Sequence, residues 1–277
     1  MAAPAPRDAK RARPAALEAR VSTIELPGLG KVYSVLAVKG GARFLGTKSA
    51  LYLHADGRLT LLAGHPSEAG FADGQRVEAR FNGIYGLALE RGGSVLVCDC
   101  NNHSVRRVSR HGQVTTVAGN GEEGFADGVG DAARFNWPED IEVDSQGLIY
   151  VADSENHCIR TVQPADGTVS TLCGKGKEAG CANGPAAEAR FRCPTGLALD
   201  MNEDLIVADN GQGLPAGDTE LSADEAAPRN GNSGASKRSG LGLEIMFRLA
   251  EHGGLKLHLR SRAGHGVLAA LSCPASR

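Results

Sequence analysis

The pentapeptide Gly70-Phe71-Ala72-Asp73-Gly74 returns as Gly124-Phe125-Ala126-Asp127-Gly128 and, in altered form, as Gly180-Cys181-Ala182-Asn183-Gly184. The second copy starts 54 residues after the first, and the third starts 56 residues after the second. A tripeptide follows each copy in phase, as Ala79-Arg80-Phe81, Ala133-Arg134-Phe135 and Ala189-Arg190-Phe191. Self-similarity at a fixed period is the sequence signature of a repeat architecture. We therefore interpret the chain as a series of similar structural units.

Each unit contains four short apolar runs that are typical of β-strands. In one unit the runs are Tyr85–Leu89, Val95–Cys98, Val105–Val108 and Val114–Val117. In the next unit they are Ile141–Val143, Leu148–Ala152, Cys158–Val162 and Val169–Leu172. Glycine is abundant, with 37 residues, and supplies the tight turns between the runs. Four antiparallel strands in a unit of this length predict one blade of a β-propeller.

The pattern predicts an all-β fold, an incomplete β-propeller of about three four-stranded blades plus a partial fourth. We expect blades near residues 28–64, 84–119 and 138–174, and the opening strands of another blade within residues 195–209. The first blade is degenerate, because Gly46-Thr47-Lys48-Ser49 stands where the later blades have an aspartate followed by an Asn-His pair. The segment 129–135 is expected to form one helical turn between blades.

Two stretches resemble the core of an NHL repeat, namely Val151-Ala152-Asp153-Ser154-Glu155-Asn156-His157-Cys158-Ile159-Arg160 and Cys98-Asp99-Cys100-Asn101-Asn102-His103-Ser104-Val105-Arg106. The openings Tyr85–Leu89 and Pro194–Asp200 fit the same motif. The resemblance covers about residues 27–210 and is to NHL proteins of the algal and plant type. It implies a β-propeller that binds partners.

The repeated polar residues at the strand ends are the candidate structural motif: Asp99, Asn102, His103, Asp153, Asn156 and His157. A carboxylate in this position can accept backbone N–H groups and hold the following turn. Recurrence in successive blades favours this structural role over a metal-binding or catalytic one, since a catalytic site is single. The repeated Arg80 and Arg134 are expected to pair with Asp73 and Asp127 in the connections between blades.

The repeat ends after Asp209, and the sequence predicts two further regions. Residues 211–239 are polar and are expected to form a disordered linker. Residues 240–277 are expected to form a helix and a hairpin. The helix is predicted from the spacing of Leu241, Leu243, Ile245, Met246 and Leu249, and the hairpin from the runs Leu255–Arg260 and Val267–Cys273.

The tail 209–277 resembles the C-terminal half of the ATP-binding domain of histidine kinases and related GHKL ATPases. The stretches that carry this resemblance are Asp209-Asn210-Gly211-Gln212-Gly213-Leu214-Pro215, Ser239-Gly240-Leu241-Gly242-Leu243, His252-Gly253-Gly254 and Arg262-Ala263-Gly264-His265-Gly266. The resemblance implies that a nucleotide would be bound by Asp209, Gly211, Gly213, Gly240 and Gly242. The helix that carries the magnesium-binding asparagine in those ATPases is missing upstream of Asp209, so we expect a vestigial site and no bound cofactor.

The N-terminal segment and the overall composition bear on location. Residues 1–20 are rich in Ala, Pro and Arg and are expected to form a disordered basic arm, while residues 21–210 form the propeller region. Within the arm, Lys10-Arg11-Ala12-Arg13 is a short basic cluster of the kind found in nuclear import signals, and a transit peptide is an alternative. Seven cysteines without a disulfide-like spacing, and no long apolar run, predict an intracellular protein, cytoplasmic or nuclear.

Composition and motifs favour a non-enzymatic scaffold for protein–protein interaction. With a net charge of -2 and 4% aromatic residues, we expect neither nucleic-acid nor membrane binding. The first alternative is a propeller hydrolase of the gluconolactonase-like type, in which carboxylates hold a metal in the central channel. The carboxylates near the expected inner strands form no recognisable ligand set, so we assign no metal-binding residue; they are Glu90, Glu139, Asp140, Glu142 and Asp144. The second alternative is nucleotide binding by the tail.

Closure of the ring is an open question at the level of sequence, because a partial blade leaves the backbone of Leu205–Asp209 unpaired. One solution is that the tail hairpin pairs with this edge. The other is self-association of two chains through their open blade edges.

Overall fold

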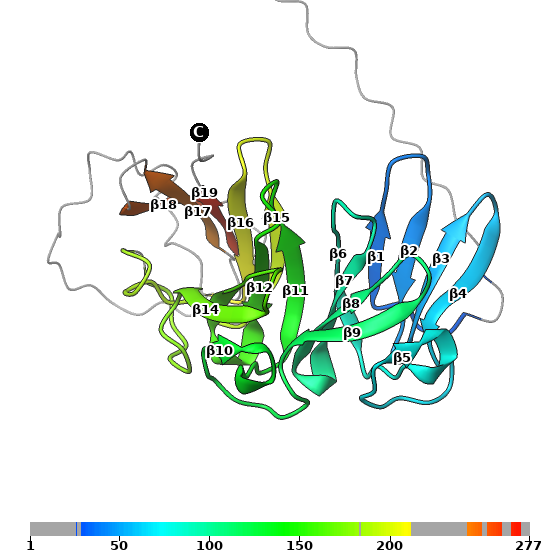
Figure 1. Cartoon of the computed structure of the whole chain (residues 1–277). Coiled ribbons are helices and arrows are strands. Elements are labelled where there is room, and N and C mark those ends of the chain that lie inside the picture. The colour runs from blue at the N-terminus through cyan, green and yellow to red at the C-terminus, as the bar shows by residue number, and fades with distance from the viewer. Residues whose placement is uncertain are drawn as a thin grey trace, which may run out of the picture.

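The computed structural model describes Leu26 and residues 29–182, 184–211, 243–250, 254–261 and 267–272. Within this part of the chain, all regular structure is β-strand or short 3-10 helix, and no α-helix is present. Figure 1 shows the strands gathered into four sheets that stand side by side. The predicted calls on residues 1–20 and 212–239 lie outside the described residues.

Three sheets are complete blades, in which consecutive antiparallel strands pair with each other. Blade 1 contains β1 (Ser34–Ala37), β2 (Arg43–Gly46), β3 (Ala50–Ala55) and β4 (Arg58–Gly64). Blade 2 contains β6 (Ile84–Leu89), β7 (Val95–Asp99), β8 (Ser104–Val108) and β9 (Gln113–Ala118). Blade 3 contains β11 (Pro138–Val143), β12 (Ile149–Asp153), β13 (Cys158–Val162) and β14 (Thr168–Cys173). Blade 4 begins with β15 (Pro194–Leu199) and β16 (Asp204–Asp209). The all-β, incomplete propeller predicted from the repeats is therefore confirmed.

The connections between blades wrap around the outer edge of the blade that follows. β5 (Gly74–Gln75) pairs with β9, and β10 (Gly128–Val129) pairs with β14, so each connection adds a fifth strand to the next blade. Short 3-10 helices, η1 (Arg76–Glu78) and η3 (Gly130–Ala132), come directly after these strands. The helical turn expected within 129–135 is η3.

The first strands of the blades, β1, β6, β11 and β15, contact one another in that order and form the inner wall of the arc. Gly86 permits the close approach of β6 and β11. A Cβ atom at Gly86 would lie 2.7 Å from the Cα atom of Asp140, closer than side chains tolerate. Two further 3-10 turns, η2 (Cys100–Asn102) and η4 (Ser154–Asn156), lie at the end of the blades where the chain enters β6 and β11. We call this end the connector face.

The hydrophobic core is divided into three clusters, each between two adjacent blades. The cluster between blades 1 and 2 includes Leu51 and Val97, and the cluster between blades 2 and 3 includes Leu96 and Val151. The third cluster joins blade 3 to Leu197 and Val207 of blade 4. Among the described residues, no core cluster joins blade 4 to blade 1, so the four blades form an arc.

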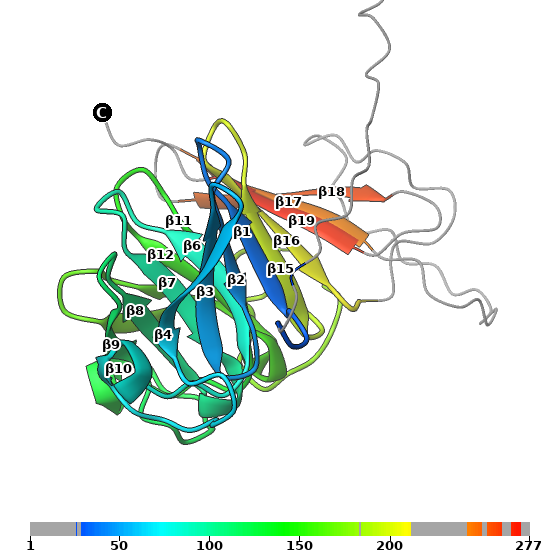
Figure 2. The ribbon, with the colours of Figure 1, turned by 90° about the vertical axis from the view of Figure 1, so that its right-hand side faces the viewer.

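The predicted tail helix is wrong, because the structure has a strand, β17 (Leu243–Ala250), where the helix was expected. The tail also contains β18 (Gly254–Ser261) and β19 (Val267–Ser272), which agree with the predicted hairpin. β17 and β19 both pair with β16, so the edge of β16 is paired within the chain (Figure 2). Apolar residues in β17 also alternate with a period of two, and an unpaired edge of blade 4 offers strand partners, which explains why the strand prevails.

The described residues include no helix that is long and apolar enough to span a membrane.

Candidate functional site

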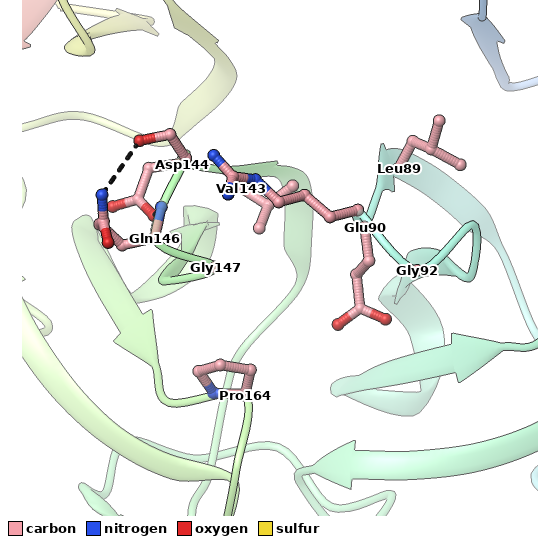
Figure 3. A pocket seen from close by; sticks show the side chains of 10 residues that line it. Leu89, Glu90, Gly92, Val143, Asp144, Gln146, Gly147 and Pro164 are labelled. Carbon is pink, nitrogen blue, oxygen red and sulfur yellow. Dashed lines mark hydrogen bonds between the residues drawn. The ribbon is translucent and has the colours of Figure 1, made fainter.

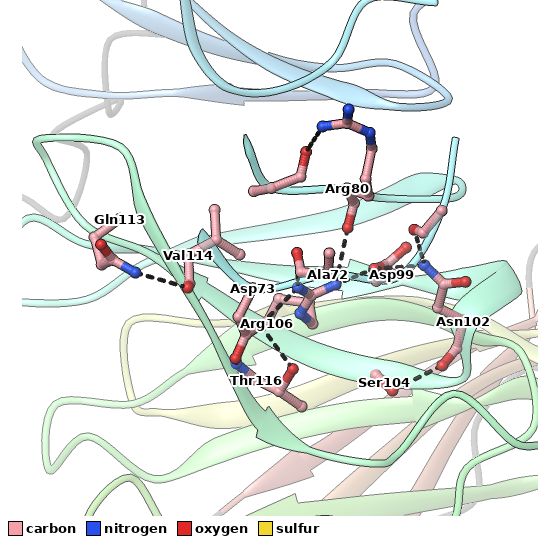
Figure 4. A network of polar contacts seen from close by, with 12 residues as sticks. Ala72, Asp73, Arg80, Asp99, Asn102, Ser104, Arg106, Gln113, Val114 and Thr116 are labelled. Atoms are coloured by element: carbon pink, nitrogen blue, oxygen red, sulfur yellow. Dashed lines mark hydrogen bonds and ion pairs between the residues drawn. The ribbon is translucent and has the colours of Figure 1, made fainter. Parts of the chain in front are cut away.

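A buried arginine organises the repeated polar residues of blade 2. Arg106 on β8 has a fully buried side chain, and its Nη1 donates to Oδ2 of Asp99 at 2.7 Å. Its Nη2 donates to Oδ1 of Asp73, in the preceding connection, also at 2.7 Å. Two backbone carbonyl oxygens, of Ala72 and Arg80, accept further bonds from the same guanidinium group. Figure 4 shows that the network ties the connection to the blade that it wraps.

Asp99 accepts hydrogen bonds from three directions. Its Oδ1 accepts the backbone N–H of Asn82, where the chain enters β6, at 2.7 Å. Its Oδ2 accepts the amide Nδ2 of Asn102 at 2.9 Å, which holds the turn after β7. Burial raises the pKa of Asp99 to about 6, although the charge of Arg106 and the bonds from Asn102 and Asn82 lower it. The motif thus stabilises both the turn and the start of the inner strand.

Blade 3 repeats this network almost bond for bond. Arg160 on β13 donates to Asp153 at 2.8 Å and to Asp127 at 2.6 Å. Asp153 accepts the backbone N–H of Asn136 at 2.7 Å and the amide of Asn156 at 2.9 Å. In both networks the aspartates and the arginine Nη atoms bind groups of the chain itself, whereas Nε of Arg106 and of Arg160 is buried without a hydrogen-bond partner.

Each buried guanidinium group also lies between two phenylalanine rings. Arg106 lies 4.8 Å from the ring centre of Phe71 and 5.3 Å from that of Phe81. Arg160 lies 4.9 Å from Phe125 and 5.4 Å from Phe135 in the same way. These distances allow cation–π attraction, which is stronger where the cation is removed from water. The phenylalanines that recur with the repeat therefore stabilise the buried positive charge of the arginine.

The predicted pairing of Arg80 and Arg134 with the connection aspartates is wrong. Arg80 pairs with Glu68 at 2.8 Å, and Arg134 lies 3.8 Å from Glu122. The connection aspartates Asp73 and Asp127 instead form ion pairs with Arg106 and Arg160, which stand within the repeated motif but were not predicted as partners. An arginine in phase within two apolar strands was the signal that could have identified them.

The two motif histidines connect neighbouring blades. His103 and His157 have left-handed backbone, with φ of 48° and 56°, and end the 3-10 turns. Nδ1 of His103 accepts the backbone N–H of Trp137, and Nδ1 of His157 accepts that of Cys193, both at 3.2 Å. Burial lowers the pKa of His103, which favours the neutral ring that can accept this bond. The motif thereby fixes the relative position of two blades.

Trp137 is an exposed aromatic residue at the centre of this junction. Its φ of 54° is left-handed, a conformation that bulky side chains rarely adopt, and the residue is 40% exposed. Blade 2 has Gly83 at the equivalent position, with φ of 90°, and blade 4 has Cys193, with φ of 46°. Uncommon backbone conformations of this kind cluster at functional sites.

The carboxylates of Glu139 and Glu155 lie at the connector face close to the inner strands, and neither has an ion-pair partner among the described residues. Among the described residues Glu139 has no ion pair; burial raises its pKa, and so do the neighbouring charges of Glu155 and Asp140. The ring centres of Tyr33 and Tyr85 lie 5.0 Å apart nearby, with the rings tilted by 32°; burial raises the pKa of Tyr85, and the charge of Glu139 raises it further. We call Tyr33, Tyr85, Trp137, Glu139 and Glu155 the acidic aromatic patch. Its chemistry suits a positively charged group.

The five carboxylates proposed for a hydrolase do not come together. Glu90 binds Arg107 through two bonds of 2.8 Å, and Asp144 accepts the hydroxyl of Tyr150 at 3.2 Å. Both line a groove of about 700 Å³ between the hairpins of blades 2 and 3, at the end away from the connector face (Figure 3). Asp140 accepts the backbone N–H of Leu197 at 2.7 Å. The described residues contain no group of three potential metal ligands.

Of the residues assigned to a nucleotide site, the structure describes Asp209 and Gly211. Asp209 lies at the end of β16, equivalent to Asp99 and Asp153, and accepts the backbone N–H of Arg192 at 2.9 Å. Its other oxygen accepts the backbone N–H of Gly211 at 3.1 Å. Gly213, Gly240 and Gly242 lie outside the described residues. In this conformation the hydrogen bonds of Asp209 stabilise the end of β16 and the start of blade 4.

The geometry defines an incomplete β-propeller in which blades 2 and 3 share an Asp–Asn–His–Arg motif. The comparisons identify the repeat, since the description "NHL repeat" matches residues 135–161, which include Asp153, Asn156, His157 and Arg160 of blade 3. The resemblance to NHL-repeat propellers is thereby confirmed. The description "Histidine kinase-, DNA gyrase B-, and HSP90-like ATPase" matches residues 183–277, so the tail resembles that group as well. The second match overlaps β15 and β16, which are propeller strands here.

The curated relatives are much longer proteins. The human "NHL repeat-containing protein 2" is 33% identical over 156 residues, which cover 52% of this chain and 20% of that protein. The Arabidopsis thaliana "Protein SUPPRESSOR OF QUENCHING 1, chloroplastic" is 31% identical over 137 residues, which cover 50% of this chain and 12% of that protein. The chain thus spans one fifth or less of the length of these relatives.

Solved structures with the same fold have low sequence identity. A structural genomics protein from Bacteroides thetaiotaomicron has a TM-score of 0.55 and 22% identity, covering 65% of this chain and 45% of that one. A virginiamycin B lyase from Staphylococcus aureus has a TM-score of 0.50 and 13% identity, covering 87% of this chain and 60% of that one. These likenesses concern the fold, because propellers with different activities share one architecture.

Proposed function

We propose that this chain is a non-catalytic propeller scaffold that binds a protein partner, and that the acidic aromatic patch receives a basic segment of that partner. One observation carries the proposal: Trp137 is exposed and left-handed beside Glu139, which has no cationic partner among the described residues. Aromatic residues are over-represented in protein interfaces, and a lysine or arginine would supply the missing charge.

The repeated network supports a scaffold role for the rest of the connector face. Its aspartates, asparagines and arginines recur in two blades and bind groups of the chain itself. Such a framework holds the turns and the patch in place, as rigid repeats do for the loops that bind partners. The sequence of the patch, in contrast, differs from blade to blade, as expected of a single binding site.

Trp137 is the only tryptophan of the chain, so its fluorescence is a direct probe of the patch. We would titrate the full chain with synthetic peptides of equal length that are basic, neutral or acidic. Basic peptides are expected to change the fluorescence saturably, and Glu139→Gln is expected to weaken their binding at least about tenfold. The matched control is Glu78→Gln, which changes an exposed glutamate on a connection.

Two results would contradict the proposed site. The first is equal binding of basic and acidic peptides, and the second is the absence of any response to basic peptides at millimolar concentration. If the fluorescence response to basic peptides is unchanged by Glu139→Gln, the peptides bind at a site other than the acidic aromatic patch.

We also propose an intracellular location. The six cysteines within the described residues are all free, and burial raises the pKa values of Cys98, Cys158 and Cys173, which keeps these thiols protonated and unreactive. Imaging of the tagged full chain, with and without residues 1–20, would test the compartment and the role of the basic segment.

A further inference from the structure

Blade 1 presents an apolar row on the side that faces away from blade 2. Val35, Leu45, Tyr52 and Leu61 stand opposite one another on β1, β2, β3 and β4, and so lie on one face of the sheet. We call this row the head face. Val35 is 60% exposed, Tyr52 and Leu61 are half-buried, and Leu45 is 5% exposed; no blade formed by the described residues packs on this row.

In the next two blades the first three residues of the same row are buried, and the fourth is half-buried. The equivalent residues are Leu87, Val97, Arg106 and Thr116 in blade 2, and Ile141, Val151, Arg160 and Thr171 in blade 3. Leu87 is 9% exposed and Ile141 is 1% exposed, because each packs against the preceding blade. By this equivalence, the head face of blade 1 is a surface built to pack on another blade.

Blade 1 departs from the repeat at two positions of the row. Tyr52 replaces the buried arginine, and Leu61 replaces the threonine whose hydroxyl binds the connection aspartate in blade 2 (Thr116 to Asp73, 2.9 Å). Blade 1 therefore has neither of the two side chains that bind the connection aspartate in blade 2. The head face is adapted to an apolar neighbour without that carboxylate.

The outward side of blade 4 has the complementary composition. Gly196, Ala198, Ile206 and Ala208 lie on one face of β15 and β16, opposite to the Leu197 and Val207 side that packs on blade 3. We call this set the tail face. Blade 2 has Gly86, Ala88, Leu96 and Cys98 at the equivalent positions, and there Ala88, Leu96 and Cys98 pack against Ile141 and Val151 of blade 3. Small residues on one blade thus receive branched residues of the next.

The charged residues at the edges of the head face and the tail face are also complementary. Arg43 lies on the head-face side of β2 and has no ion-pair partner among the described residues. Asp204 lies on the tail-face side of β16, at the same end of the blade, next to the β15–β16 hairpin. An Arg43–Asp204 approach across the junction would help to set its register.

We propose that the head face of one molecule packs on the tail face of a second copy of this chain, as adjacent blades pack within the arc. The paired edge of β16 makes association through open strand edges, the alternative considered from the sequence, unnecessary. A head-to-tail contact uses two different surfaces of each molecule, so it closes a ring or continues to further copies.

The test is sedimentation velocity on the full chain over a wide concentration range, with one variant on each face. Val35→Asp changes the head face, and Ala198→Arg changes the tail face; both residues are exposed in the single chain, so both variants are expected to fold. Each variant alone is expected to associate at least about tenfold more weakly than the unaltered chain. Val77→Asp, at a 51% exposed valine on a connection, is the matched control and is expected to associate normally.

Mixing the two variants gives the sharpest result. The Val35→Asp chain keeps an intact tail face and the Ala198→Arg chain keeps an intact head face, so the mixture is expected to form a one-to-one complex that neither forms alone. The proposal is overturned if the unaltered chain stays monomeric throughout, or if Val35→Asp prevents association while Ala198→Arg does not, which indicates head-to-head contact. This readout is independent of peptide binding at the acidic aromatic patch.

Discussion

At the scale of single residues, the stability of blades 2 and 3 depends on how the fold compensates a fully buried charge. Arg106 and Arg160 are completely removed from water, and each receives two carboxylates, two carbonyl oxygens and two aromatic rings. Removing one partner of a buried ion pair is costly, because the other charge remains buried without compensation.

Arg106→Met is therefore expected to lower the free energy of unfolding by about 3–5 kcal/mol. Urea denaturation followed by circular dichroism would measure the change. Adding Asp99→Asn to the same chain should recover part of the loss, since the unpaired carboxylate is then neutral. Arg110→Met, which removes only a bond to the carbonyl oxygen of Gly92, is the control and should change stability by less than about 0.5 kcal/mol.

A second effect at this scale is a dependence of stability on pH. Burial, followed by the charge of Asp140, raises the pKa of Glu142 to about 7 from its ordinary value of 4.5. Between these two values the folded chain holds a proton that the unfolded chain releases, so stability falls as the pH rises through this window.

Glu142→Gln should remove this loss. We expect the variant to match the unaltered chain at pH 4, below both pKa values, and to be more stable at pH 8, by about 1 kcal/mol, a value reduced for solvent screening. Urea midpoints at the two pH values would measure the difference, with Glu78→Gln as the exposed control. Equal pH dependence in the variant and the unaltered chain would show that Glu142 ionises normally.

At the scale of elements, the connections interlock with one another as well as with the blades. Phe125, which stacks on Arg160, also lies against Gly176 of the next connection, where a Cβ atom would overlap the ring. Phe71 and Gly121 form the corresponding contact one connection earlier. Each of these two glycines therefore contacts the aromatic ring of the preceding connection, which covers the arginine of blade 2 or of blade 3.

Gly176→Ala is expected to displace Phe125 and to lower the free energy of unfolding by about 1–3 kcal/mol through overpacking. Differential scanning calorimetry would show a lower melting temperature. Gly92→Ala is the matched control, because no atom lies within 4 Å of its added Cβ position. If both variants melt together, the ring has room to move and the interlock is not important for stability.

At the scale of the whole molecule, the arc ends on one side at the head face and on the other at a sheet that the tail extends. β17 and β19 satisfy backbone groups of β16 that would otherwise be free to pair with other chains. Ending the chain after Gly211 should therefore increase aggregation. Static light scattering during slow heating would measure it, and a chain without residues 1–20 is the control.

The chain that ends after Gly211 also distinguishes association through a free β16 edge from the proposed head-to-tail contact. Aggregation through a free β16 edge should not depend on Val35, whereas the head-to-tail contact should. A shortened chain that remains as soluble as the unaltered one would show that the tail strands do not protect the edge.

The amino-acid sequence by itself determined the repeat, its period and the strands of each blade. Apolar runs, turn glycines and the aspartates at strand ends are local patterns, and they place β6–β9 and β12–β14 to within one residue, whereas β11 begins three residues before the predicted run. Turn residues such as Asn102 and Asn156 could likewise be identified, because they bond to an aspartate three residues away.

Only the tertiary structure decided which residues meet across the blades. Arg106 finds Asp73 and Arg160 finds Asp127 at 33 residues' separation, because the connection wraps the outer edge of the blade; a charge pattern along the chain contains no such information. The tail sequence 243–250 is compatible with both a helical and an alternating pattern, and pairing with β16 selected the strand. Local spacing fixes which element can form, whereas long-range pairing and burial determine which one does.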